Sequence, residues 1–159
     1  MRNTDIRVSE EKPVTPAFLA AALLWPVVRV HFEQGMKRGM KNTLALQQAM
    51  YEAVEMQTQR VLIPRRISVP MRDIWSFQLR LERRSGKRPL RLLTHPRFRA
   101  AFDFLQLRAM SGESTEISEL SDWWQQFQSA NSKDRQGTVN QNKKRTIRKR
   151  RSRHPDKRI

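Results

Sequence analysis

The residues with the clearest potential for chemistry are the cations of segment 60–99. This segment holds twelve basic and two acidic side chains, and eleven of the twelve cations are arginine. The planar guanidinium group of arginine matches phosphate oxygens better than an ammonium group does. On an ideal helix, Arg72, Arg80 and Lys87 fall on one face and the apolar residues of the segment fall on another.

This spacing predicts a ladder of cations that binds the phosphates of a nucleic-acid strand. Cations one helical turn apart would lie about 5–6 Å from each other, close to the phosphate spacing along a strand. A solvated helix face is the alternative, but a face that only confers solubility normally mixes both signs of charge. The predicted RNA-binding residues of this segment are Arg72, Arg80, Arg83, Arg84, Lys87, Arg88 and Arg91.

A second basic block occupies residues 131–159, which also hold twelve basic and two acidic side chains. A segment so rich in like charges and so poor in apolar residues is expected to be disordered and to bind RNA or DNA through counterion release. Anionic lipid, or nuclear import in a eukaryotic cell, would fit such a tail as well. Its predicted RNA-binding residues are Lys143, Lys144, Arg145, Arg148, Lys149, Arg150 and Arg151.

No pattern of catalytic residues accompanies these cations. The histidines, His31, His95 and His154, are scattered along the chain, and cysteine is absent. The run from Ser85 to Arg88 resembles a phosphate-binding loop, but a leucine stands where the first glycine of that motif belongs. The motifs therefore predict no catalytic residue, no metal ligand and no cofactor in this chain.

The charge of the whole chain limits the class of its partner. A formal net charge of +17 on 159 residues indicates a polyanion, with nucleic acid first and an anionic membrane surface second. The longest apolar run, 17–28, has twelve residues, whereas a membrane span needs about 20. We therefore expect no transmembrane segment, no export and a cytoplasmic location.

Hydrophobic periodicity predicts an all-α bundle of about five helices. Thr15 and Pro16 are typical of a helix start, and Gly35 is expected to end that helix. We expect Trp75 to pack in the core, and only one of the adjacent residues Trp123 and Trp124 to face it. The predicted helices cover about 16–34, 43 to just before Pro64, 69–85, 94–110 and 118–130.

Several long runs resemble a known family. These are 72–88 (RDIWSFQLRLERRSGKR), 92–109 (LLTHPRFRAAFDFLQLRA) and 123–128 (WWQQFQ), preceded by 3–7 (NTDIR) and 16–26 (PAFLAAALLWP). In this order they resemble the C-terminal half of bacterial poly(A) polymerases, of the tRNA nucleotidyltransferase/poly(A) polymerase family. The resemblance covers residues 3–130, and the tail matches in composition alone.

The resemblance implies a helical neck and body that hold RNA, and a catalytic head that lies outside this chain. The head of that family would use ATP and Mg²⁺ to extend RNA 3′ ends, so this chain would not adenylate RNA alone. The resemblance also implies a neck and body segment, 1–66, and an arginine-rich RNA-binding domain, 67–130. The third region is the tail that its composition predicts to be disordered, 131–159.

Three hypotheses follow from the sequence. The first is that the chain is the RNA-binding portion of a poly(A) polymerase, present as a fragment, a truncated reading frame or a split gene product. The second is that it is active when paired with a separately encoded catalytic head. The third is a non-catalytic basic protein that binds nucleic acid or a membrane surface.

Overall fold

The first helix begins at the cap that the sequence predicts. The structure is a computed structural model that describes residues 15–130, 134, 135 and 137. The hydroxyl oxygen of Thr15 accepts a hydrogen bond from the backbone N–H of Phe18 at 3.2 Å, and Pro16 occupies the first turn of α2 (Pro16–Lys37). Proline is favourable there because the missing N–H would have no partner within the helix. The helix continues through Pro26.

Gly35 does not end α2, contrary to the prediction. A Cβ atom at Gly35 would lie 3.1 Å from the Cβ of Ala45 in the next helix, so this glycine provides close packing between two helices. The left-handed residue is Gly39, with φ of 80°, and it follows the end of α2. The two possible uses of glycine, helix stop and close approach, are not distinguishable in the sequence.

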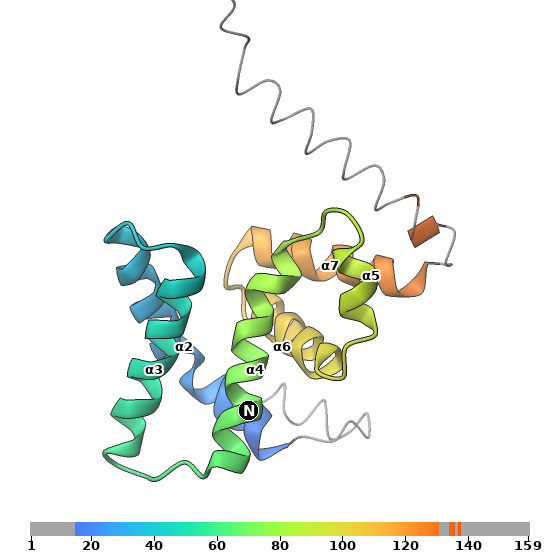
Figure 1. Cartoon of the computed structure of the whole chain (residues 1–159). Coiled ribbons are helices and arrows are strands. Elements are labelled where there is room, and N and C mark those ends of the chain that lie inside the picture. The colour runs from blue at the N-terminus through green and yellow to red at the C-terminus, as the bar shows by residue number, and fades with distance from the viewer. Residues whose placement is uncertain (1–14, 131–133, 136, 138–159) are drawn as a thin grey trace, which may run out of the picture.

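The next two helices form the left side and the centre of the molecule in Figure 1. The second helix, α3, spans Asn42–Thr58, and α4 spans Arg65–Glu82. The predicted start of α4 at residue 69 is wrong, because the helix accommodates Pro70 in its second turn. Its predicted end at Ser85 is also wrong, because Arg83 has a ψ of 82° and so leaves the helical conformation.

Three further helices complete the bundle. The short helix α5 (Arg88–Leu93) was not predicted, and the described part of the chain therefore has six helices and not five. The helix α6 spans Phe98–Met110, and α7 spans Thr115–Ser129. The predicted start of α7 at Ser118 is wrong because the cap is Ser114, whose hydroxyl oxygen accepts the N–H of Ile117 at 3.3 Å. The all-α prediction is confirmed.

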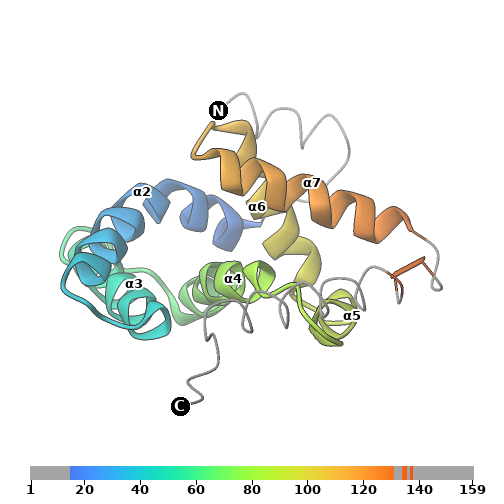
Figure 2. The same ribbon diagram turned by 90° about the horizontal axis from the view of Figure 1, so that it is seen from above.

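The helix α4 lies between α2 and α3 on one side and α5 to α7 on the other, as Figures 1 and 2 show from two directions. It contributes to two hydrophobic clusters. Ile74 and Trp75 belong to a cluster with α2, α3 and Phe104 of α6. Phe77 and Leu81, one turn further along α4, belong to a second cluster with α5, α6 and α7. The predicted boundary at residue 66 falls in the first turn of α4, and that division stays a prediction.

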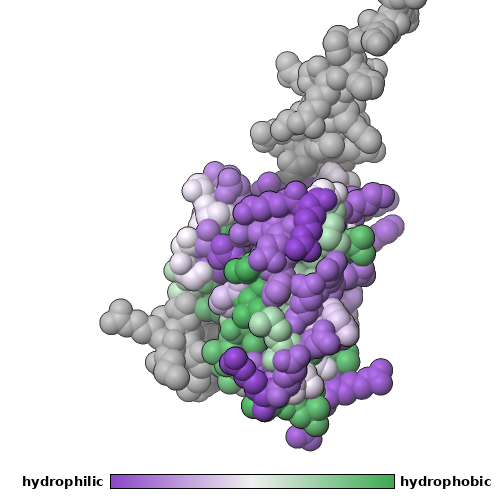
Figure 3. All heavy atoms as spheres, turned by 90° about the vertical axis from the view of Figure 1, so that its left-hand side faces the viewer, coloured by the Kyte–Doolittle hydropathy of each residue, from purple (hydrophilic) through white to green (hydrophobic). Residues whose placement is uncertain are grey.

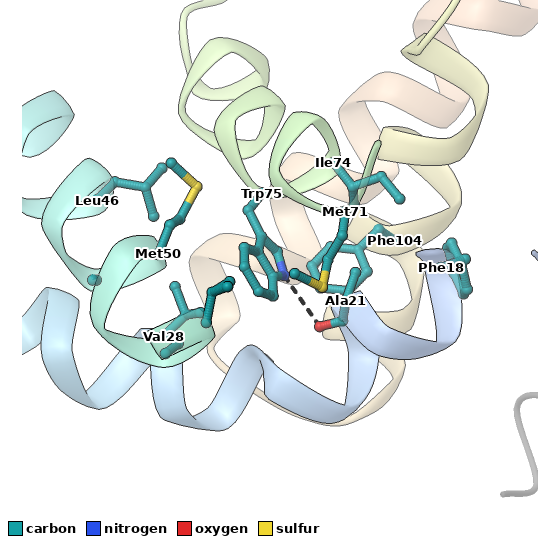
Figure 4. Close-up of a cluster of buried hydrophobic side chains, with 12 residues drawn as sticks. Phe18, Ala21, Val28, Leu46, Met50, Met71, Ile74, Trp75 and Phe104 are labelled. Carbon is teal, nitrogen blue, oxygen red and sulfur yellow. Dashed lines mark hydrogen bonds between the residues drawn. The ribbon is translucent and has the colours of Figure 1, made fainter. Parts of the chain in front are cut away.

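Each cluster contains a fully buried tryptophan with a satisfied N–H. The indole N–H of Trp75 donates to the carbonyl of Ala21 at 3.1 Å (Figure 4). The indole N–H of Trp124 donates to the carbonyl of Leu81 at 3.0 Å, while Trp123 is only partly buried. Both sequence predictions about the tryptophans are confirmed: Trp75 is a core residue, and one of the adjacent pair faces the core.

A buried polar network joins α2, α4 and α6. Arg108 donates from Nη1 to the side-chain oxygen of Gln78 at 3.1 Å and also binds Glu113. Trp25 donates its indole N–H to the same carboxylate at 2.8 Å, and its ring lies 4.6 Å from the Arg108 guanidinium. The contacts of this network join residues of different elements, so the network holds the α6–α7 turn against α2.

No helix in the described part of the chain is long and apolar enough to cross a membrane. Of the predicted tail, the described residues are Asp134, Arg135 and Gly137. Arg135 donates to the carbonyls of Phe127 and Gln128 at 3.0 and 2.5 Å, so it satisfies carbonyls in the last turn of α7. The seven predicted RNA-binding residues from Lys143 to Arg151 lie outside the described residues.

Candidate nucleic-acid interface

The exposed face of α4 carries part of the predicted ladder of cations. Arg72, Ser76 and Arg80 are exposed on this helix, as expected from their spacing. Arg83 and Lys87 do not extend the ladder along the same helix, because α4 ends at Glu82 and Lys87 precedes α5. The ladder as a single helical face is therefore wrong, although both residues remain exposed.

A groove beside this face brings α4 together with the turn between α5 and α6. Its volume is about 540 Å³, large enough for a nucleotide-sized group. Arg80 enters it from α4, and Arg97 enters it from the turn. The described residues that line it are Asp73, Ser76, Phe77, Arg80, His95, Pro96 and Arg97.

One ring nitrogen of His95 is engaged by the backbone of its own turn. Its Nδ1 accepts the backbone N–H of Arg97 at 3.1 Å, so in the neutral ring the proton is on Nε2. The ring is packed 5.0 Å from that of Phe77, centroid to centroid. The sequence indicated a helix-entry role for His95, and the structure shows that this turn also places it in the groove.

Arg80 and Arg97 are each held by a neighbour that leaves donors available. The Arg80 guanidinium lies 4.4 Å from the centre of the Phe77 ring, which is cation–π distance. Arg97 binds Asp73 through Nε, with 3.3 Å between Nε and Oδ2. Its terminal Nη groups have no partner among the described residues. Two guanidinium groups and a histidine ring therefore line one groove, which suits a phosphate group. The hydroxyl of Ser76, which also lines it, donates to the sulfur of Met50 at 3.6 Å.

The remaining predicted cations lie on the loop after α4 and on α5. Arg84 is half-buried, with its guanidinium 5.5 Å from the centre of the Trp123 ring. Lys87, Arg88 and Arg91 are exposed. These positions extend a basic surface beyond the end of α4, with Trp123 as a partly exposed aromatic ring beside it.

Sequence reasoning did not select Ser76, His95 or Arg97 as site residues. His95 and Arg97 follow Arg80 by fifteen and seventeen positions, and no periodicity connects residues that far apart on different elements. The run from Thr94 to Arg97 could have indicated these two residues, because a tight turn between helices presents its side chains at the surface.

A second cavity of about 340 Å³ lies on another side of α4, against the buried network. Loss of hydration raises the pKa of Glu82 in its wall, although Arg108 and Arg83 act in the opposite direction. Burial also disfavours ionised Glu113, but hydrogen bonds and the positive charge of Arg108, with help from Trp25 and Arg29, hold the pKa of Glu113 below its ordinary value. Two arginines line this cavity as well, but Arg29 and Arg108 both pair with Glu113.

A family comparison decides which class of protein carries this basic groove. A family model described as polymerase A arginine-rich C-terminus matches residues 38–158. The chain belongs to the poly(A) polymerase family. The match includes α3 to α7, and with them every residue that lines the groove.

Relatives in this poly(A) polymerase family carry the name poly(A) polymerase I. The protein from Salmonella typhi is 39% identical over 142 residues, which are 89% of this chain and 30% of the relative. The protein from Escherichia coli O6:H1 is 38% identical over 159 residues, which are 99% of this chain and 34% of the relative. The protein from Haemophilus influenzae is 36% identical over 140 residues, with 87% and 31% covered.

The chain thus spans about a third of the length of these relatives, and it corresponds to their arginine-rich C-terminal portion. The resemblance recognised in the sequence is confirmed. Among the described residues, no group of three or more His, Cys, Asp or Glu side chains could hold a metal ion. The Mg²⁺ that the family implies has no ligand set in this part of the chain.

Proposed function

We propose that this C-terminal portion of a poly(A) polymerase binds the phosphate backbone of RNA, and that the groove beside α4 is a contact site. The observation that supports this most is the convergence of Arg80 and Arg97, from separate elements, on one groove with Ser76 and His95. Phosphate contacts of this kind fix the position of a strand without reading its bases. The proposal therefore predicts binding that is insensitive to sequence and sensitive to salt.

The wider basic surface would extend the contact. Arg72, Arg83, Arg84, Lys87, Arg88 and Arg91 stay predicted RNA-binding residues, and so do the seven tail cations. A tail of this composition would add affinity without sequence preference. Cations on the loop after α4 and on α5 would then hold the strand beyond the end of α4.

Salt-dependent binding tests the groove directly. The full chain with its seven predicted tail cations changed to glutamine is the background, so that groove binding is not hidden by the tail. In this background, Arg80→Ala with Arg97→Ala should weaken binding of a labelled oligo(A) RNA. The slope of log affinity against log salt should fall by about 1 for each phosphate that the variant no longer neutralises.

The matched control is Arg38→Ala with Arg60→Ala, which removes the same charge from exposed sites away from the groove. Long-range attraction alone would lower affinity equally in the two double variants. Equal affinities and equal slopes in the two would overturn the assignment of the groove.

We also propose that addition of AMP from ATP to RNA 3′ ends requires a catalytic head supplied by the remaining two-thirds of such a polymerase. Two facts support this: the relatives are named poly(A) polymerases, and this chain covers 30 to 34% of them. Incubation of this chain with a candidate head, ATP, Mg²⁺ and an RNA primer should give longer products than the head alone. Equal product lengths with and without this chain would argue against the pairing.

Exposed apolar side chains on α2 and α3 support a protein partner for this face. Leu23 is 77% exposed, Leu44 55% and Leu62, after α3, 76%. Figure 3 shows apolar side chains among polar ones on the side of the molecule where α2 and α3 lie. Met36 and Met56, at the ends of these helices, are 37% and 53% exposed. A head packed on this face would cover them.

A cytoplasmic location is part of the proposal, because RNA 3′ ends and ATP are both available there. The competing function is binding to an anionic membrane surface through the basic residues, and a separate binding experiment tests it. Binding to RNA, to duplex DNA and to anionic vesicles is compared at one salt concentration. Preference for vesicles over RNA would favour the membrane function.

A further inference from the structure

Asp73 is an unexpected residue in a groove built to bind phosphate. It is the one carboxylate among the described residues that line the groove, and a carboxylate repels a phosphodiester. Its side chain is 46% exposed, so solvent and a ligand can reach it. The role of Asp73 must therefore be to hold Arg97, to bind another group of the ligand, or both.

The contact with Arg97 leaves half of the carboxylate available. The Nε of Arg97 lies 3.3 Å from Oδ2 of Asp73, and Oδ1 has no hydrogen-bond partner among the described residues. A carboxylate oxygen can only accept hydrogen bonds. A ligand group that binds at Oδ1 must therefore be a donor that lies beside a phosphate.

The ribose of RNA carries such a donor. Its 2′-hydroxyl is adjacent to the 3′-phosphate, so a phosphate bound between Arg80 and Arg97 would bring that hydroxyl close to Asp73. DNA has a C–H group in this position and offers no donor, and this hydroxyl is the group by which proteins distinguish the two nucleic acids. Asp73 would repel the phosphates of RNA and of DNA equally, so this repulsion would not distinguish the two nucleic acids.

We propose that Asp73 accepts a hydrogen bond from a ribose 2′-hydroxyl and makes the groove selective for RNA over DNA. This inference rests on the proposed function, because it requires the phosphate to be bound in the groove. It assigns to Asp73 a specificity that none of the cations can supply, since guanidinium groups bind the phosphates of either strand.

Three probes of one length test this proposal: oligo(A) RNA, the same strand with 2′-O-methyl groups, and oligo(dA). The 2′-O-methyl strand keeps the ribose oxygen and lacks the donor hydrogen. In the full chain with its seven predicted tail cations changed to glutamine, RNA should bind more tightly than the other two. Asp73→Ala should reduce the ratio of RNA to 2′-O-methyl affinity several-fold, up to about tenfold. Asp73→Asn, which retains an acceptor oxygen, should keep part of the ratio.

The control is Asp122→Ala, which removes one exposed carboxylate from α7, away from the groove. It should leave the ratios unchanged. An equal rise in affinity for all three probes in Asp73→Ala would show that Asp73 acts only as a repelling charge. An equal fall would show that it only positions Arg97. Either result overturns the inference.

The result for Asp73 is separable from the proposed function. Weaker binding in the Arg80 and Arg97 variants, with unchanged ratios in Asp73→Ala, would retain phosphate binding and reject selectivity. Unchanged affinity in the arginine variants would reject the groove itself. Far-ultraviolet circular dichroism of every variant establishes that the helices are intact.

Discussion

Arg108 and Glu113 form a buried ion pair with two hydrogen bonds, from Nε to Oε2 at 3.0 Å and from Nη2 to Oε1 at 2.5 Å. Both side chains are 9% exposed. Such a pair does not by itself make a fold more stable than apolar packing would, but removal of one partner leaves a buried charge uncompensated. Arg108 therefore connects the α6–α7 turn to α2 and α4 at a position where substitution has large consequences.

Arg108→Met should lower the free energy of unfolding by about 3–5 kcal/mol, because it removes the paired positive charge from buried Glu113 and the donor from the side-chain oxygen of Gln78. Urea denaturation measures this. Arg72→Met, at an exposed position on α4, should change it by less than about 0.5 kcal/mol. Addition of Glu113→Gln to Arg108→Met should recover part of the stability, and failure to recover any would show that the pair is not coupled.

The acid sensitivity of the fold should depend on Glu113 and Glu82 with opposite signs. The pKa of Glu113 is held below its ordinary value of 4.5, so ionised Glu113 stabilises the fold above that pH, and the contribution disappears as the pH falls through the lowered pKa. The pKa of Glu82 is raised, so protonation of Glu82 favours the fold as the pH falls. Urea midpoints between neutral and acidic pH should fall less in Glu113→Gln and more in Glu82→Gln than in the unmodified chain.

Trp75→Phe and Trp124→Phe test whether the two hydrophobic clusters unfold together. Each change removes an indole N–H whose acceptor carbonyl is buried, and should cost about 1–3 kcal/mol. Because α4 contributes to both clusters, we expect both variants to shift the same single urea transition. Two separate transitions, each moved by one variant, would mean that the two hydrophobic clusters unfold independently.

RNA binding should change the fluorescence of Trp123. This residue is partly exposed and lies beside Arg84, whereas Trp75 and Trp124 are fully buried. A strand held by Arg84 would therefore alter the surroundings of Trp123 more than those of the buried rings. Trp123→Phe should abolish most of the change on titration with oligo(A), and Arg84→Ala should reduce it. A full response in Trp123→Phe would place the strand elsewhere.

The fold class, the family and the strongly positive charge of the chain all follow from the sequence alone. Periodicity predicts helices reliably because each helix must place one apolar stripe on the core, as Met50 and Trp75 do here. Helix ends were less predictable, since Gly35 serves close packing and Ser114, not Ser118, caps α7. The short helix α5 has too few residues for a periodic signal.

Tertiary packing, in contrast, selects which of the many cations share a groove. Arg80 was predicted from its helical face, but His95 and Arg97 meet it because the α5–α6 turn packs beside α4. Lys87 lies off the predicted face because the helix ends at Glu82. The sequence shows how many cations a segment has. Which of them share a groove depends on packing between elements that are distant in sequence.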